Sequence, residues 1–337
     1  MKIGQFDLEE KVLIVAEIGN NHEGNFEVAK KLVREAANCG VDAVKFQTFK
    51  TEHYVSHSDT ARFERLKSFE LSDSQFSELA ELARSLGLMF FSTPLDLPSA
   101  NFLNKIVDSY KIASCDNNFY PLLETICQTG KPIILSSGIV DLEQIQASQK
   151  FIETCWQNRK IDGDLAILHC VSSYPVPPEQ ANLLAIPFMR DRLQTTIGYS
   201  DHTIGIDACL SAVAIGAKIL EKHFTLDHHY SDFRDHQLSA DPSEMKQLVE
   251  GVAKVKSMLG KPEKVVQPCE VNAIPLIRRS IAAARSLPQG HQLELDDLMW
   301  IRPGTGLPPG EENKAIGKTL KRSLEAGELI DLADLEK

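Results

Sequence analysis

Eight short apolar segments, separated by longer segments of helical period, restrict the folds that this chain can adopt. The segments are rich in Val, Ile and Phe, as expected of buried strands. They span residues 12–19, 42–49, 88–94, 109–114, 132–138, 165–171, 195–201 and 218–224. Eight such strands alternating with helices predict a closed parallel (β/α)8 barrel, an α/β fold of the TIM type.

A doubly wound open sheet would show the same alternation and is the competing fold. That fold usually carries a glycine-rich phosphate turn of the form GxGxxG after its first strand. The first strand here is followed instead by IGNNHEGN at residues 18–25. The barrel is therefore the preferred prediction.

The pattern changes after a predicted helix at about 241–259. The sequence LGKPEKVVQPCEVNAIPLI has Pro and Gly at intervals and no clean periodicity, which is typical of a linker. We therefore predict a barrel domain over residues 1–260, a linker over 261–278 and a second domain over 279–337.

The second domain contains an internal repeat. LPQGHQLELDDL at 287–298 matches LEAGELIDLADL at 324–335 in several leucine, glycine and aspartate positions. This repeat predicts a small duplicated β-rich module. Each copy would supply a glycine-centred turn, a short strand and an apolar-acidic helical turn.

The composition is that of an ordinary water-soluble protein with a large core, at 337 residues, 43% hydrophobic and 25% charged. A net charge of −11 without a basic cluster argues against a nucleic-acid partner. No apolar run reaches the roughly 18 residues of a membrane span, and MKIGQFDLEEK lacks the order of a signal peptide. The seven cysteines form no CxxC pair. We therefore expect a cytoplasmic protein with no membrane partner.

Two histidines follow the last two predicted strands. In a barrel, the last residues of the strands converge on one mouth, so His202 and His223 should lie near each other there. Two imidazoles at such a place predict a divalent metal site with coordination positions open to substrate. The competing interpretation is that one or both are hydrogen-bonded packing residues.

Two lysines, Lys45 and Lys111, lie inside otherwise apolar strands. They are costly to bury without a counter-charge, which the surrounding hydroxyl groups suggest is a phosphate or carboxylate of the substrate. The competing interpretation is a salt bridge to a barrel Glu or Asp. The full set of polar residues expected at the mouth is Glu17, Asn20, Asn21, His22, Lys45, Gln47, Ser92, Thr93, Lys111, Ser114, Ser136, Ser137, Ser172, Tyr174, Ser200, Asp201, His202 and His223. Together these residues favour a phosphorylated substrate beside a metal.

The order of these segments resembles a known family. AEIGNNHEGN, VKFQTF, STP, YKIAS, ILSSG, LHCVSSYPVP, GYSDHT and LEKHFTLD are similar to segments of the sialic acid (N-acetylneuraminate) synthases. The tail SIAAARSLPQGHQLELDDLMWIRPGTG resembles the antifreeze-like (SAF, β-clip) domain that ends those enzymes. The resemblance implies a transferase that condenses phosphoenolpyruvate with an N-acylated hexose and water. The products would be phosphate and a nine-carbon 2-keto acid sugar of the sialic, legionaminic or pseudaminic type.

The resemblance also implies roles for individual residues. His202 and His223 would ligate a divalent metal, Mn²⁺ in preference to Mg²⁺ or Co²⁺, and act in catalysis with Glu17. The phosphoenolpyruvate-binding residues would be Lys45, Thr93, Lys111, Ser114, Ser136, Ser172 and Ser200. The sugar-binding residues would be Gln47, Tyr174, Asp235 and Arg302. Because the family places this arginine over the sugar of a partner subunit, the resemblance implies a domain-swapped homodimer.

Two departures from the family pattern bear on the acceptor sugar. Ser172 stands where some sialic acid synthases have Asn, and SDFRDH at 231–236 replaces a common RPGPDH. N-acetylmannosamine and 2,4-diacetamido hexoses rank above mannose as acceptors, because Arg302 would have an acyl group to recognise. The competing functions are a Schiff-base aldolase, using Lys45, Lys111 or Lys222, and a non-catalytic carbohydrate-binding or ice-binding protein.

Overall fold

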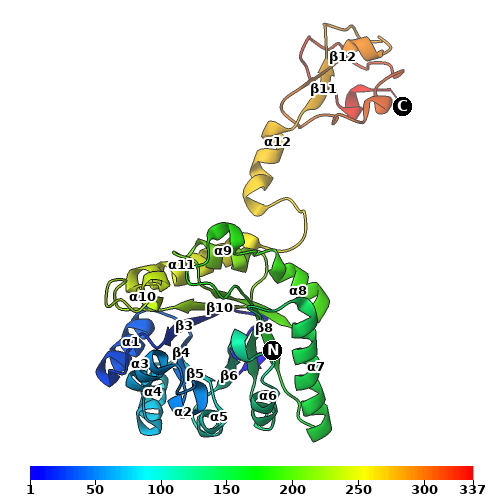
Figure 1. Cartoon of the computed structure of the whole chain (residues 1–337). Helices are drawn as coiled ribbons and strands as arrows, with labels where there is room; N and C mark the ends of the chain where they lie inside the picture. The colour runs from blue at the N-terminus through cyan, green and yellow to red at the C-terminus, as the bar shows by residue number, and fades with distance from the viewer. Residues whose placement is uncertain (337) are drawn as a thin grey trace. The chain divides into compact units, whose positions relative to one another are not determined.

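A computed structural model of the chain describes residues 1–336 and contains a closed barrel of eight parallel strands (Figure 1). The predicted (β/α)8 barrel is therefore confirmed. Neighbouring strands pair in chain order, and the last strand closes the barrel by pairing with the first. The strands are β3 (Leu13–Gly19), β4 (Ala43–Thr48), β5 (Met89–Pro94), β6 (Ser109–Ile112), β7 (Ile133–Ser136), β8 (Leu165–Cys170), β9 (Thr196–Asp201) and β10 (Ile219–His223).

Helices surround the barrel and bury one face each against it (Figure 1). In α1, Leu32, Val33 and Ala36 recur at helical spacing and are buried, while the opposite face is exposed. The helices of this part of the chain are α1 (Phe26–Cys39), α2 (Thr51–Tyr54), α3 (Thr60–Phe69), α4 (Asp73–Ser85), α5 (Leu97–Leu103), α6 (Tyr120–Cys127), α7 (Leu142–Arg159), α8 (Ala185–Leu193), α9 (Asp207–Ala214), α10 (Asp235–Leu238) and α11 (Pro242–Leu259), with 3-10 turns η1 (Ser114–Asp116) and η2 (Pro178–Gln180).

A short hairpin of β1 (Lys2–Ile3) and β2 (Phe6–Asp7) precedes the barrel. Its strands are too short to produce a periodic pattern, so the sequence analysis did not predict it. Ile3 and Leu8 are fully buried, and they join the cluster of inward-facing residues near the starts of the strands. The hairpin therefore packs against the barrel interior at the end opposite the strand termini that carry the polar residues.

Asp201 faces away from the mouth at which it was expected. Alternation along β9 and β10 turns Asp201 and Lys222 outward, while Ser200 and Glu221 point inward. Outside the barrel, the Lys222 Nζ lies 2.8 Å from Asp201 Oδ2, and both side chains are almost completely buried. The expectation for Asp201 was wrong because it counted position along the strand and not the face on which the side chain lies.

The chain forms two compact units, Met1–Gly260 and the segment from Lys261 onward. The second unit begins with η3 (Pro268–Ala273) and α12 (Ile274–Ile277), which the aperiodic sequence did not predict. It contains an antiparallel pair, β11 (Ser280–Ala283) and β12 (Leu298–Ile301), and 3-10 turns η4 (Leu295–Asp297), η5 (Glu312–Lys314) and η6 (Leu332–Asp334).

The internal repeat is visible in the second unit. η4 and η6 close equivalent capping boxes, and equivalent arginines bind them: Arg285 to Asp297 at 2.7 Å and Arg322 to Asp334 at 2.6 Å. The short strand expected in each copy is reduced to isolated bridges, including Leu287 with Leu324. Within residues 1–336, no helix is both long and apolar enough to cross a membrane.

The outward pair gives a stability prediction. Lys222→Met should leave the Asp201 carboxylate buried without its cation and lower the free energy of unfolding in urea by about 3–5 kcal/mol. Lys2→Met is the control, because it removes only a surface pair with Asp7 and should change the free energy of unfolding far less than Lys222→Met does. An equal decrease in the free energy of unfolding in the two variants would show that the buried pair stabilises the fold no more than a surface pair does.

Candidate active site

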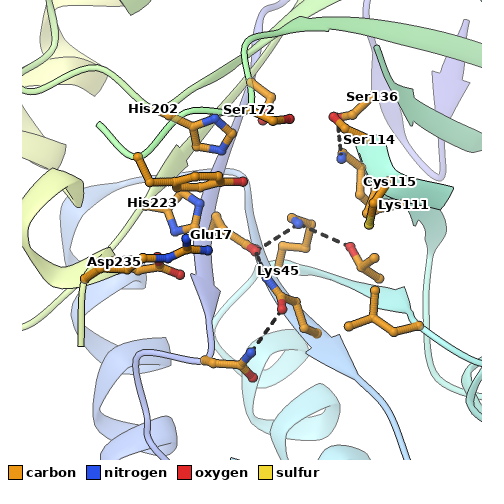
Figure 2. Close-up of a pocket in the computed structure, with 18 of the residues that line it drawn as sticks. Glu17, Lys45, Lys111, Ser114, Cys115, Ser136, Ser172, His202, His223 and Asp235 are labelled. Atoms are coloured by element: carbon orange, nitrogen blue, oxygen red, sulfur yellow. Dashed lines mark hydrogen bonds and ion pairs between the residues drawn. The ribbon is translucent and has the colours of Figure 1, made fainter. Parts of the chain in front are cut away.

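A cavity of about 700 Å³ opens at the carboxyl ends of the barrel strands (Figure 2). It brings together every barrel residue that the sequence analysis assigned to the site. These residues are Glu17, Lys45, Gln47, Thr93, Lys111, Ser114, Ser136, Ser172, Tyr174, Ser200, His202, His223 and Asp235. Of the other polar residues expected at the mouth, Asn20 lines the cavity, whereas Asn21, His22, Ser92, Ser137 and Asp201 do not.

Arg302 belongs to the C-terminal unit. Within that unit its Nε donates a hydrogen bond to the Ile277 carbonyl oxygen at 2.7 Å, and the residue is exposed. Its contact with the sugar of a partner subunit stays a prediction.

Strand register determines which side chains meet on the cavity floor. Glu17 lies beside His223 on one neighbouring strand and beside Lys45 on the other. Residues that are side by side in a parallel sheet point to the same face, so all three enter the barrel mouth together. The Lys45 Nζ lies 3.0 Å from Glu17 Oε1.

Glu221 is a site residue that the sequence analysis missed. Its Oε1 lies 3.6 Å from the Nζ atoms of both Lys45 and Lys111, and it accepts a hydrogen bond from Ser200 at 2.9 Å. Each buried lysine therefore has a barrel carboxylate nearby, as the salt-bridge interpretation required. Glu221 precedes His223 by two positions on one strand, so the period-2 rule alone would have placed it in the mouth.

The four buried charges shift one another's pKa values. Burial raises the pKa of Glu17, and Glu221 adds to this rise while Lys45 opposes it. Burial acts to raise the pKa of Glu221 as well, but Lys111 and Lys45 outweigh it and the pKa is lowered. Burial lowers the pKa of Lys111. For Lys45, burial acts in the same direction but the two carboxylates prevail, so its pKa is raised.

Hydroxyl groups surround the lysines on the side of the cavity formed by β5, β6 and β7 (Figure 2). Lys111 donates to the Ser136 hydroxyl at 2.6 Å, and Lys45 donates to Thr93 at 3.2 Å. The Gly138 N–H donates to Ser114 Oγ at 3.0 Å. Cationic ammonium groups among hydroxyls form a suitable environment for a phosphate group.

Gly138 is needed where it stands because two serines approach its backbone closely. A Cβ atom there would lie 2.3 Å from Ser172 Oγ and 2.7 Å from Ser114 Oγ. Any side chain at this position would therefore displace the hydroxyls.

The two predicted metal ligands lie together on the opposite side of the cavity, with ring centroids 5.3 Å apart (Figure 2). Nδ1 of His202 donates to the Val171 carbonyl oxygen at 2.8 Å. Burial acts to lower the pKa of His202, but its contacts with Cys170 and with the Val171 carbonyl outweigh burial, so the pKa is raised. Nδ1 of His223 and Oε2 of Glu17 are buried with no hydrogen-bond partner among the described residues. Burial lowers the pKa of His223 well below its ordinary value, which keeps the ring neutral.

These features fit a divalent metal held by two imidazoles, whose binding would displace any proton from the coordinating nitrogen atoms. A metal needs an unprotonated ring nitrogen, and a backbone carbonyl often fixes the other nitrogen of the ring, as Val171 does for His202. The orphaned atoms of His223 and Glu17 would gain partners if a ligand or ion entered.

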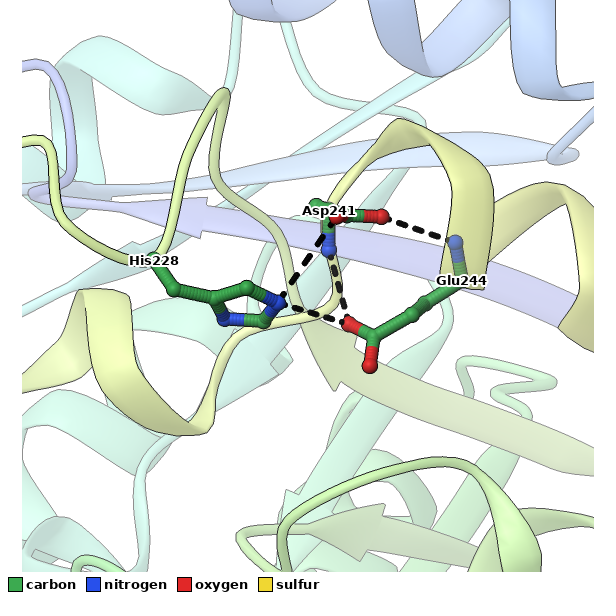
Figure 3. A group of neighbouring side chains, drawn as sticks. All are labelled: His228, Asp241 and Glu244. Carbon is green, nitrogen blue, oxygen red and sulfur yellow. Dashed lines mark hydrogen bonds and ion pairs between the residues drawn. The ribbon is translucent and has the colours of Figure 1, made fainter.

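A second group that could hold a cation lies outside this cavity (Figure 3). Nε2 of His228 lies 3.1 Å from Glu244 Oε2 and 3.7 Å from Asp241 Oδ2. Asp241 and Glu244 form the capping box at the start of α11. The cluster is explained by this helix cap with a partly exposed histidine beside it, and we assign no metal to it.

The segment between β4 and α4 supplies cavity residues that the sequence analysis did not identify. Arg62 and Arg65, one turn apart on α3, line the cavity, and neither has a carboxylate within 4.0 Å in residues 1–336. Phe69 and Phe233 meet edge to face at 5.3 Å beside them. The sequence shows that Arg62 and Arg65 are one helical turn apart, but it does not show that this face of α3 is turned toward the cavity.

Comparison with known proteins agrees with this geometry. Residues 32–264 match the NeuB family, and residues 278–336 match the SAF domain. The chain belongs to the NeuB family. It is an enzyme of the sialic acid synthase type, with a TIM-type barrel followed by a SAF domain.

Relatives of this NeuB family member are synthases of several acidic sugars. It is 38% identical to the N,N'-diacetyllegionaminic acid synthase of Legionella pneumophila, over 93% of this chain and 92% of that protein. It is 33% identical to the N-acetylneuraminate-9-phosphate synthase of Mus musculus, over 94% and 90%. A crystal structure of the N-acetylneuraminic acid synthetase from Leptospira borgpetersenii, in complex with citrate, is similar with a TM-score of 0.76 and 34% identity, covering 81% of this chain and 94% of that one.

The close approach at Gly138 gives a binding prediction. Gly138→Ala should displace the Ser114 and Ser172 hydroxyls and lower the affinity for inorganic phosphate at least about tenfold by calorimetric titration. Ser137→Ala is the control, because that hydroxyl donates to the Leu168 carbonyl and does not line this cavity. Unchanged phosphate affinity in Gly138→Ala would place the anion elsewhere.

Proposed function

We propose that this NeuB family enzyme condenses phosphoenolpyruvate with an N-acylated hexose and water, giving a nine-carbon 2-keto acid sugar and phosphate. The observation that carries the proposal is one cavity that combines two buried lysines, a set of hydroxyls and two converging imidazoles. The names of the relatives, which are synthases of acidic sugars, support the same reaction class.

Phosphoenolpyruvate would bind on the side formed by β4 to β9. Lys45 and Lys111 would orient its anionic groups, with Thr93, Ser114, Ser136, Ser172 and Ser200 as hydrogen-bond partners. Holding the enol carbon C3 near C1 of the sugar replaces an improbable encounter by a fixed approach.

Charge balance supports the involvement of a cation. The positive charges of Lys45 and Lys111 are offset by the negative charges of Glu17 and Glu221. These four side chains together therefore offer little net positive charge to a substrate that is at least dianionic. His202 and His223 would hold a divalent metal, Mn²⁺ in preference to Mg²⁺ or Co²⁺. When bound, such an ion supplies positive charge and polarises the aldehyde oxygen of the open-chain sugar.

The chemical steps then follow from the groups present. C3 of phosphoenolpyruvate attacks C1 of the sugar, and C2 becomes cationic as the new bond forms. Water adds at C2, and the tetrahedral hemiketal phosphate collapses to the keto acid and inorganic phosphate by C–O cleavage. Glu17, with one carboxylate oxygen unpartnered, would handle a proton or position the aldehyde or water.

The acceptor sugar would occupy the side of the cavity nearest Gln47, Tyr174 and Asp235. The centre of the Tyr174 ring lies 4.2 Å from the centre of the His202 ring, so Tyr174 stands beside one of the residues that would hold the metal. We further propose a domain-swapped homodimer in which Arg302 of the partner subunit covers the acyl group. This arrangement favours N-acetylmannosamine or a 2,4-diacetamido hexose over mannose.

A Schiff-base aldolase is the competing enzyme. Lys222 lies outside the barrel interior in an ion pair, and the pKa of Lys45 is raised despite burial, so neither suits a free amine nucleophile. Burial lowers the pKa of Lys111, so this lysine is the remaining candidate for the amine nucleophile of an aldolase. Borohydride reduction with a carbonyl substrate should give no covalent adduct.

Phosphate release from phosphoenolpyruvate tests the proposal. We expect release with Mn²⁺, loss of release in EDTA, and dependence on one acceptor among N-acetylmannosamine, its 6-phosphate, diacetamido hexoses and mannose. The 6-phosphate is included because one relative makes a 9-phosphorylated product. No release from any pair, by a protein shown to be folded, would refute the function.

Glu17→Gln separates a chemical role of this carboxylate from a structural one. The variant keeps the side-chain size but removes the charge and the proton-accepting oxygen. We expect a fall in turnover of at least about tenfold in a protein that is still folded by circular dichroism, because Lys45 keeps Glu221 as a counter-charge. Turnover near that of the unaltered enzyme would remove Glu17 from the chemistry.

A further inference from the structure

We propose that Glu23 and His236 are positioning residues that hold residues 225–239 in place and thereby set the location of Asp235 at the acceptor side of the cavity. The proposal rests on the proposed function for its kinetic consequence. Neither residue lines the cavity, so any effect on the substrate must pass through the segment that they hold.

The first contact joins the turn after β3 to this segment. His236 is 1% exposed, and its Nε2 donates to Glu23 Oε1 at 2.9 Å. The Ser231 hydroxyl donates to the same oxygen. The other ring nitrogen of His236 lies 2.7 Å from Thr225 Oγ1. One carboxylate therefore anchors both halves of the segment.

A second set of contacts joins the same two parts of the chain. The buried amide of Asn21 donates to the Phe224 carbonyl at 2.8 Å and to Ser239 Oγ at 3.0 Å. Ser239 Oγ in turn donates to the backbone carbonyl of Asp235 at 2.5 Å. Asn21 was expected to line the barrel mouth, but its side chain instead binds the two ends of this segment, at Phe224 and Ser239.

The turn that supplies these groups is itself held firmly. Glu23 has a φ of 48°, which is uncommon for a residue with a side chain, and Gly24 follows with a φ of 78°. A Cβ on Gly24 would lie 2.0 Å from the Ser68 carbonyl oxygen, so the turn packs directly against the end of α3. The anchor is therefore a fixed part of the barrel and not a mobile loop.

The held segment carries four consecutive residues that line the cavity, Asp232, Phe233, Arg234 and Asp235. The Arg234 guanidinium lies 4.5 Å from the centre of the Tyr174 ring, and its Nε lies 3.2 Å from Asp235 Oδ1. Asp235 is labelled at the edge of the cavity in Figure 2. Side-chain hydrogen bonds accepted by Glu23 and donated by Asn21 thus hold this segment, whereas a strand ladder positions the residues on the opposite side.

This difference predicts that loss of the Glu23 side chain changes the KM for one substrate and not for the other. Residues proposed for phosphoenolpyruvate belong to strands or follow them directly, and they do not depend on Glu23. Glu23→Ala should raise the KM for the acceptor sugar about tenfold and leave the KM for phosphoenolpyruvate within about twofold. Glu23→Gln keeps an oxygen that can accept from His236 and Ser231, and it should recover most of the loss.

The control is Glu27→Ala, four residues further along, which removes only an exposed pair with Lys30. It should change neither KM. An unchanged acceptor KM in Glu23→Ala, or an equal rise in both KM values, would overturn the positioning role.

Hydrogen–deuterium exchange of the free enzyme tests the clamp without any turnover. Glu23→Ala and His236→Gln should each speed amide exchange within residues 225–239, while Glu27→Ala should not. Exchange unchanged in both variants would refute the clamp. If no acceptor supports phosphate release, the proposed function fails by that assay and the exchange measurement still decides on the clamp.

Discussion

The buried cluster of Lys45, Lys111, Glu17 and Glu221 is the interaction around which the site is arranged. Four charges taken out of water are tolerated only when each has an opposite charge or hydrogen-bond partner close by. The closed barrel provides this by turning one face of each strand toward a common centre. Glu221 is essential to the balance, because it lies equally near both lysines.

This balance has a chemical consequence. An anion that enters the cavity must compete with two carboxylates for the same ammonium groups, so its binding is coupled to the charge state of the floor and to any cation beside it. The two carboxylates offset the two ammonium groups, so the cavity floor is not a simple basic pocket. It also agrees with a chain whose overall charge is −11 and which must still receive an anionic substrate.

The two sides of the cavity are built by different means. Strand register positions Lys45, Lys111 and His223, and the hydroxyl groups proposed to bind phosphoenolpyruvate lie on strands or directly after them. The side that we propose for the acceptor includes residues 225–239, which are held through side-chain hydrogen bonds and through the contact between Phe69 and Phe233. The family motif changes at 231–236 fall on this side.

The sequence by itself determined the eight strands, the repeat in the C-terminal unit and most of the cavity residues that follow strand ends, because strand ends in a parallel barrel converge whatever lies between them. Asp235, which lies beyond the last strand, was assigned only through the family resemblance. Period-2 alternation was also available in the sequence, and it would have added Glu221 and removed Asp201. Only the tertiary structure decided that α3 turns Arg62 and Arg65 into the cavity, and that Glu23 and Asn21 hold a segment more than two hundred residues away. Helix direction and such distant hydrogen bonds depend on how separate elements pack, and no local pattern of residues encodes that packing.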